Sequence, residues 1–161
     1  MTVFLSTFVN RIDKKGRVSV PASFRAVLGP EAPGIVVFRS LQYKALDGCS
    51  VAHLELLSRS LERTDLPPET YELIETTIFG GSVQVPIDKE GRITVPSDLA
   101  EDVGISEEVA FVGRNKTFQL WDPIRLISHL SDARATARAQ DISLSKIIAQ
   151  ATRHMGSGES S

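Results

Sequence analysis

The stretch IDKKGRVSVP, residues 12–21, returns in the same chain as IDKEGRITVP, residues 87–96. Asp13 aligns with Asp88 at an offset of 75 residues, and the same offset aligns residues 12–47 with the second copy without a gap. Similarity held at one fixed period is the sequence sign of a duplicated structural unit. The sequence therefore predicts that the fold is built from two copies of one unit.

The repeated stretch predicts a tight turn followed by a strand. Asp13 can accept backbone N–H groups within a turn, and Gly16 can adopt a positive φ. After the turn, polar and apolar residues alternate over residues 17–20, as in a strand with one buried face. Val18 is therefore expected to face a core, and Arg17 to point outward beside the turn.

Each copy continues into a short helix and a second pair of strands. Pro21 suits the first turn of a helix over residues 22–28, and Gly29 suits its end. Strands are expected over residues 35–38 and 43–46. The matching positions of the second copy are Pro96, Gly104 and residues 110–112 and 118–121. The predicted unit is a β-hairpin, a helix and a second β-hairpin.

Helices are expected outside the two units, because apolar residues there recur at helical spacing. A last helix is expected to follow a break near residues 141–143, and the Gly/Ser-rich end is expected to be disordered. The predicted division is repeat 1 at residues 5–52, a helical connector at 53–81, repeat 2 at 82–125, C-terminal helices at 126–151 and a disordered tail at 152–161.

A unit of about 40 residues is too small to bury a sufficient core by itself. The two copies are therefore expected to pack on each other as a pseudo-twofold β-barrel, with two turns facing outward. The predicted fold class is α+β, with tandem β-hairpin/helix/β-hairpin units and flanking helices.

Composition limits the classes of function. The chain of 161 residues has a net charge of −2 and a pI near 5.9, so any anion-binding surface must be local. Cys49 is the only cysteine, which excludes an intrachain disulfide and fits a reducing compartment. No apolar run has transmembrane length. We expect a soluble, cytoplasmic protein.

A local positive patch surrounds the first turn, in which Asp13 is the only acid. Its cations are Arg11, Lys14, Lys15, Arg17 and Arg25. Arginine can bind guanine or phosphate through two parallel hydrogen bonds, and lysine supplies mobile charge to phosphates. The turn could also be a plain tight hairpin whose arginine pairs with its aspartate. The duplication and the basic cluster favour nucleic-acid binding, whereas Arg25 alone is interpreted as a solvated charge on a helix.

Two copies of Asp-x-x-Gly-Arg, each followed by β-branched residues and proline, end near an aromatic residue and aspartate (YKALD and FQLWD). With the opening FLSTFVNRIDKKGRVSVP, these motifs resemble the MraZ family of bacterial transcriptional regulators, which have two SpoVT/AbrB-type domains. The resemblance covers residues 1–148. It implies an AbrB-like swapped-hairpin β-barrel, in which hairpins of the two repeats interleave.

The resemblance also implies a function. Members of this family form rings, bind direct repeats upstream of the division and cell-wall operon that contains their own gene, and chiefly repress it. The implied partners are double-stranded DNA and further copies of the chain, in a cytoplasmic, nucleoid-associated protein. No membrane, cofactor, metal or small-molecule ligand is expected.

The family contacts DNA through an Asp-x-x-x-Arg turn. Carried over with its neighbours, it predicts the DNA-binding residues Arg11, Asp13, Lys14, Lys15, Gly16, Arg17, Asp88, Lys89, Gly91 and Arg92. The first turn reads Lys14-Lys15 and the second Lys89-Glu90, so the first is expected to carry more of the phosphate contact.

Three other interpretations stay open at this stage. An enzyme or metal site could use Cys49 and His53, but no third ligand of suitable type lies nearby in sequence, so no enzyme is predicted. A structural assembly protein could use the apolar helix expected over residues 54–61 as an interface. An AbrB-type antitoxin would share the fold, although such proteins usually carry one repeat and a toxin-binding tail.

Overall fold

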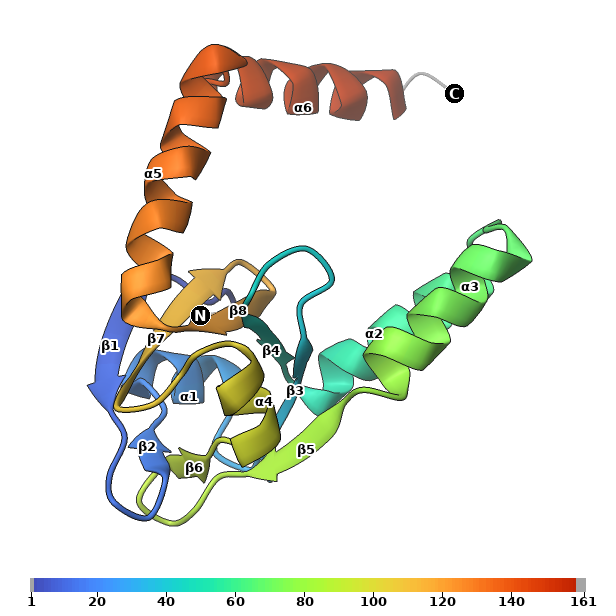
Figure 1. The fold of residues 1–161 in the computed structure, drawn as a ribbon. Coiled ribbons are helices and arrows are strands. Elements are labelled where there is room, and N and C mark those ends of the chain that lie inside the picture. Colours follow the sequence, from blue (N-terminus) through green and yellow to red (C-terminus); the bar gives the residue numbers. More distant parts are fainter. Residues whose placement is uncertain (1, 159–161) are drawn as a thin grey trace. The chain divides into compact units, whose positions relative to one another are not determined.

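The computed structural model describes residues 2–158 and divides into two units, Met1–Pro123 and Ile124–Ser161, each treated below by itself. The first unit holds the sheets and five helical segments (Figure 1). Its elements are β1 (Thr7–Arg11), β2 (Arg17–Ser19), α1 (Ala22–Leu28), β3 (Gly34–Arg39), β4 (Leu46–Cys49), α2 (Val51–Glu62), α3 (Pro68–Ile74), the π-helix η1 (Glu75–Phe79), β5 (Val83–Pro86), β6 (Arg92–Thr94), α4 (Ser97–Asp102), β7 (Glu108–Arg114) and β8 (Thr117–Trp121).

The strands of the two repeats exchange partners. The larger sheet has the order β1-β7-β8-β4-β3-β5, so the first strand of each repeat lies against the other repeat. The second strands, β2 and β6, pair with each other in a separate antiparallel ladder. The α+β class and the antiparallel sheet are as expected. The larger sheet has open edges at β1 and β5, so the pairing does not form the closed barrel that was expected.

This exchange also corrects the expected first hairpin of each unit. β1 and β2 do not pair with each other, because each forms its ladder with a strand of the other repeat. Inside the first repeat they are joined by the turn, where the backbone N–H of Asp13 donates to the Arg17 carbonyl at 2.8 Å, and by the Asn10 amide, which donates to the Ser19 carbonyl at 2.7 Å.

The second hairpin of repeat 1 also differs from the expectation. The strand predicted over residues 43–46 instead begins at Leu46, because residues 40–45 form a longer connection. In repeat 2 the connection between β7 and β8 is short, and Asn115 has a φ of 70°. The gap-free alignment of the two copies therefore does not hold in structure for their last strands.

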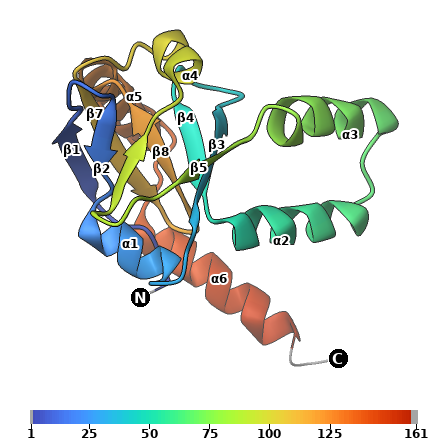
Figure 2. The ribbon, with the colours of Figure 1, turned by 90° about the horizontal axis from the view of Figure 1, so that it is seen from below.

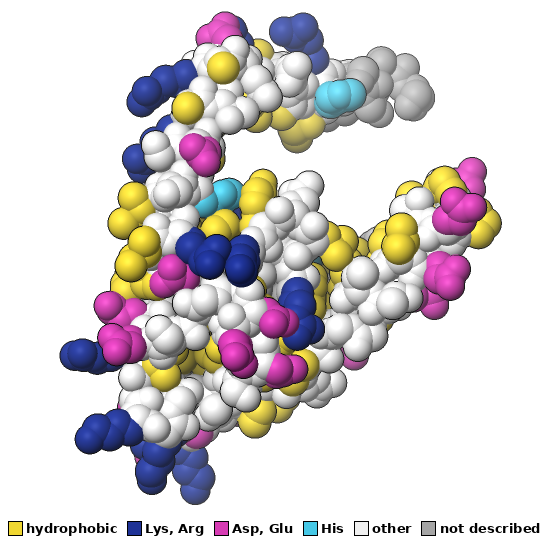
Figure 3. All heavy atoms as spheres, in the orientation of Figure 1, with side chains coloured by type: hydrophobic (Ala, Val, Ile, Leu, Met, Phe, Trp, Pro, Cys, Tyr) yellow, Lys and Arg dark blue, Asp and Glu magenta, His cyan; other side chains and the backbone are white. Residues whose placement is uncertain are grey.

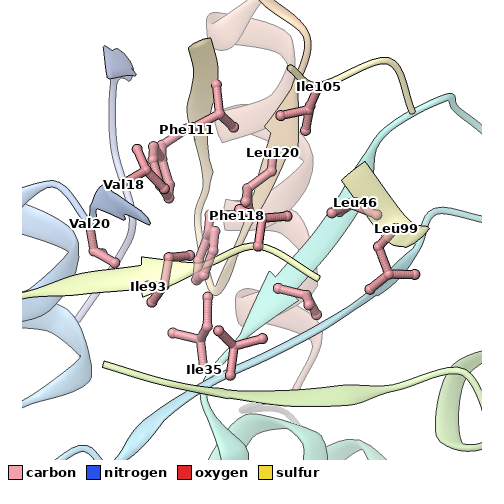
Figure 4. Close-up of a cluster of buried hydrophobic side chains, with 14 of the residues drawn as sticks. Val18, Val20, Ile35, Leu46, Ile93, Leu99, Ile105, Phe111, Phe118 and Leu120 are labelled. Carbon is pink, nitrogen blue, oxygen red and sulfur yellow. The ribbon is translucent and has the colours of Figure 1, made fainter. Parts of the chain in front are cut away.

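The core forms where the two repeats meet. Val18 and Ile93, equivalent residues of β2 and β6, are both buried, as is Leu99 of α4 (Figure 4). Phe24 of α1, the equivalent of Leu99, is also buried. Phe24 lies at the centre of an aromatic cluster. Its ring centroid is 5.2 Å from that of Phe4, 5.4 Å from Phe118, 5.8 Å from Phe8 and 6.2 Å from Phe111. Because both repeats supply this core, neither buries it alone.

A helical arm, made of α2, α3 and η1, connects the two repeats along the chain. It projects to one side of the larger sheet (Figure 2). The Ser50 hydroxyl accepts the backbone N–H of His53 at 3.0 Å and caps α2, and Pro68 begins α3. Both helices were predicted from their apolar spacing. The switch to a π-helix at Glu75 was not.

The second unit contains α5 (Pro123–Ala139) and α6 (Leu144–Gly158). The expected break between them is confirmed, and Asp141 lies in it with a φ of 53°. A disordered tail was expected over residues 152–161. The structure instead continues α6 through residues 152–158, and residues 159–161 lie outside the described part. Among the described residues no helix has both the length and the apolar character needed to span a membrane.

Candidate nucleic-acid interface

The first repeated turn is organised by the carboxylate of Asp13. Its Oδ1 accepts the backbone N–H groups of Lys15 at 2.9 Å and of Arg17 at 2.8 Å. Its Oδ2 accepts Nε of the Arg17 side chain, also at 2.8 Å. The turn closes with the Gly16 N–H on the Asp13 carbonyl at 3.0 Å. One carboxylate therefore fixes both the turn and the direction of the arginine.

The second turn reproduces this geometry. Asp88 Oδ1 accepts the backbone N–H groups of Glu90 and Arg92, both at 2.9 Å, and Oδ2 accepts Arg92 Nε at 3.1 Å. The Gly91 N–H again closes the turn on the aspartate carbonyl at 3.0 Å. The two motifs that are alike in sequence are therefore alike in hydrogen bonding.

Glycine is required in both turns because the backbone is left-handed there. The φ angles are 82° at Gly16 and 79° at Gly91, in a region that side chains other than glycine rarely adopt. The expected role of these glycines in the turn is confirmed.

The hydrogen bonds lower the pKa of both turn carboxyls. For Asp13 the backbone N–H of Arg17 has the largest effect and takes the pKa below the ordinary 3.8, against an opposing effect of desolvation. Asp88 is lowered in the same way by the backbone N–H of Arg92. Because the folded pKa lies below the unfolded value, this stabilisation is present above the unfolded pKa and is lost as the pH falls through the folded pKa. The carboxylates of Asp13 and Asp88 are therefore charged at neutral pH.

The ladder of β2 and β6 places the two arginines on one face. Arg17 lies opposite Thr94, and Arg92 lies opposite Ser19. The residues between them, Val18 and Ile93, point into the core, so both arginines point outward from diagonal positions, where Cα atoms are about 7–8 Å apart. Lys and Arg side chains gather at the end of the unit where the turns lie (Figure 3).

The remaining predicted residues surround this face. Lys14, Lys15 and Lys89 are exposed in the turns themselves. Arg11 is exposed at the end of β1, where its register partner is Glu108. The structure therefore brings the predicted residues of each repeat to the same end of the unit.

The two arginines differ in one contact. Arg92 Nη2 also donates to Glu90 Oε2 at 3.4 Å, so this guanidinium is shared between two acids. Within the described residues, Arg17 has an ion pair with Asp13 alone. Arg17 therefore has more of its donor groups available to a ligand.

Comparison with known proteins supports a family assignment. The chain is 41% identical over 146 residues to a protein named transcriptional regulator MraZ from Rickettsia bellii (strain OSU 85-389), an alignment that covers 89% of this chain and 97% of the relative. A protein of the same name from Rickettsia akari (strain Hartford) is 40% identical over 145 residues, with the same coverage. The chain belongs to the MraZ family.

The MraZ family model, whose description compares its members with antitoxins, matches residues 78–144. This span contains the second turn and the strands of repeat 2, β5 to β8. The MraZ relatives, by contrast, align across both repeats, because they cover 89% of the chain.

The alternative site at Cys49 has little chemical support in this MraZ chain. Cys49 is buried, and burial raises the pKa of its thiol to about 11, with the charge of Asp47 adding to the effect. The thiol is therefore protonated at neutral pH and is a poor nucleophile or metal ligand. Within residues 2–158, no three His, Cys, Asp or Glu side chains are grouped in a way that could hold a metal ion.

Proposed function

We propose that this chain is a DNA-binding transcriptional regulator that contacts double-stranded DNA with its two Asp-x-x-Gly-Arg turns. The observation that carries the proposal is the β2–β6 ladder, which points Arg17 and Arg92 outward from one face. The naming of its relatives as transcriptional regulators supports the same conclusion.

The proposed roles follow from the chemistry of the side chains. Arg17 and Arg92 can donate paired hydrogen bonds to a guanine edge or to a phosphate, while their aspartates hold them in position. The lysines of the turns and Arg11 contact phosphates, whose attraction depends on charge more than on geometry. The glycines Gly16 and Gly91 keep the backbone turned.

Several copies of this interface are needed for useful affinity. One protomer offers only a few phosphate contacts, but linked copies raise the effective concentration of each later contact. We therefore propose a ring oligomer on direct DNA repeats, with strand exchange as in the family's swapped-hairpin barrel.

By the family resemblance, the DNA sites lie upstream of the division and cell-wall operon that contains the protein's own gene, and the protein mainly represses this operon. Such a protein would be cytoplasmic and nucleoid-associated, with no enzymatic activity.

The first test compares wild type with the double variant Arg17→Ala/Arg92→Ala. Fluorescence anisotropy would measure binding to duplex DNA from upstream of the protein's own gene, and to a scrambled duplex of equal length, over a salt titration. We expect wild type to bind with a steep salt dependence and the double variant to lose most of this binding, because the outward guanidinium groups are gone. Light scattering should give the same oligomer size for both.

Arg59→Ala/Arg63→Ala is the control, since it also removes two arginines, but exposed ones from the helical arm. It should bind DNA as wild type does. If instead the turn variant binds as tightly as wild type, the arginines serve only the turns and the DNA-binding surface is elsewhere.

A further inference from the structure

Arg25, on helix α1 of the first repeat, lies against the turn of the second repeat. Its Nε donates to the Val20 carbonyl at 3.2 Å, and the Val20 N–H donates to the Gly91 carbonyl at 2.9 Å. A Cβ atom placed on Gly91 would meet Nη1, Cζ and Nε of Arg25 at 2.7, 2.8 and 2.9 Å. The guanidinium therefore packs directly over the Gly91 backbone.

A hollow of about 300 Å³ opens beside this contact. Arg25, Asp88, Lys89 and Gly91 all line it, so the guanidinium belongs to the surface of the second turn. With Nε held by Val20, the Nη atoms have no hydrogen-bond acceptor among the described residues. An anchored guanidinium with free donors is pre-organised to bind a phosphate, because little side-chain freedom remains to be lost.

The first turn lacks this cation. Ala100 occupies the position in repeat 2 that Arg25 holds in repeat 1, and the equivalent hollow, about 400 Å³, is lined instead by Gly16, Ala100 and Glu101. The nearest atom to a Cβ placed on Gly16 is Cγ2 of Thr94 at 3.7 Å. The hollow at the first turn therefore has no cation in the place of Arg25, and an acidic residue, Glu101, lines it instead.

The loops beside the turns strengthen this difference. Repeat 2 contributes Glu101, Glu107 and Glu108 next to the first turn, where the Glu107 carbonyl accepts the Ile12 N–H at 2.8 Å and Glu108 pairs in register with Arg11. The equivalent residues of repeat 1, beside the second turn, are Ala26, Ala32 and Pro33, and one acid, Glu31, replaces Ser106. The lysine-rich first turn therefore has more acidic residues from the other repeat beside it than the second turn has.

We propose that Arg25 is a phosphate-contacting residue of the second turn, supplied by the first repeat, and that it makes the two turns comparable in their attraction for DNA. This inference rests on the proposed function. It departs from the expectation, drawn from Lys14-Lys15 and Lys89-Glu90, that the first turn carries more of the phosphate contact. The charge of each turn depends on residues that the other repeat brings to it.

The test measures the salt dependence of binding to the same upstream duplex for Arg25→Gln, Arg25→Lys and Ala100→Arg. Loss of one phosphate contact lowers the slope of log affinity against log salt by about one for each engaged protomer. We expect this decrease for Arg25→Gln, with affinity reduced several-fold on specific and scrambled DNA alike. Arg25→Lys should retain most of the slope, and Ala100→Arg should raise it.

The outcomes separate this inference from the proposed function. If Arg25→Gln keeps the wild-type slope while Arg17→Ala/Arg92→Ala loses binding, the assignment of Arg25 is overturned and the proposed function stands. If wild type shows no salt-dependent DNA binding, both are overturned. If Arg25→Gln melts below the assay temperature, Ala100→Arg decides, because it leaves Arg25 and its bond to Val20 in place. If Ala100→Arg leaves the salt slope as in wild type, the inference is overturned.

Discussion

Gly16 and Gly91 hold equivalent places, but their neighbours differ. Both have a φ near 80°, so each turn needs a residue without a Cβ. At Gly91 a second requirement is added, because the guanidinium of Arg25 occupies the space that a Cβ would need. Gly16 has only an ordinary contact with Thr94. The two glycines therefore offer a matched pair of substitutions.

We expect both Gly16→Ala and Gly91→Ala to lower the free energy of unfolding by about 1–2 kcal/mol, the cost of a left-handed backbone with a side chain. Gly91→Ala should cost more, and should also lower the salt slope of DNA binding, because it displaces Arg25. Urea unfolding and the anisotropy titration measure the two effects. Equal losses of stability and unchanged DNA binding in both variants would contradict the contact described for Arg25.

At the scale of elements, the exchange of strands joins the repeats. β1 of repeat 1 pairs with β7 of repeat 2, and β5 of repeat 2 pairs with β3 of repeat 1. Among the described strands β2 pairs with β6 alone, so the turns themselves depend on both copies. The interface is therefore a property of the paired repeats and not of either one.

Residues 1–81, made as a separate chain, are not expected to fold as a monomer, because β1 would lack β7 and β3 would lack β5. The fragment should be either unfolded or a dimer in which a second copy replaces repeat 2. Circular dichroism and light scattering distinguish these states. A folded, monomeric fragment would show that the exchanged ladders are not needed for stability.

The sequence predicts the elements better than their pairing. Pro21 and Gly29 mark the helix of repeat 1, and the alternation around Val18 gives the buried face of β2, both as observed. The choice of β7 as partner of β1 depends on contacts far apart in the sequence, which local patterns do not report. The late start of β4 at Leu46 was missed because the copies remain aligned there in sequence while the connection before it differs in structure.

The candidate site shows the same limit. Both turns and their arginines follow directly from the repeat, because Asp, Gly and Arg are four residues or fewer apart in each motif. Arg25 was interpreted as a solvated charge because its neighbour Gly91 is far away in the sequence. The difference between Arg25 and Ala100 at equivalent positions was one signal in the sequence that the two turns have different surroundings.

For the whole molecule, the central feature is a chain of net charge −2 that has a group of cations at the end of its first unit where the turns lie (Figure 3). Acidic side chains lie on the helical arm, where Glu69, Glu72 and Glu75 follow one another at helical spacing. In the proposed complex, DNA would be attracted to this end and repelled by the arm, so the charge distribution would favour a single orientation of each protomer on the duplex.

Hydrogen–deuterium exchange of the full-length protein, with and without the upstream duplex, tests the central claim most directly. The account predicts that DNA slows exchange in the peptides that contain residues 13–17 and 88–92, with the helical arm unchanged. Protection of both turns by the same DNA would support two contact points in each protomer. Protection confined to other parts of the chain, with both turns exchanging as in the free protein, would contradict the account.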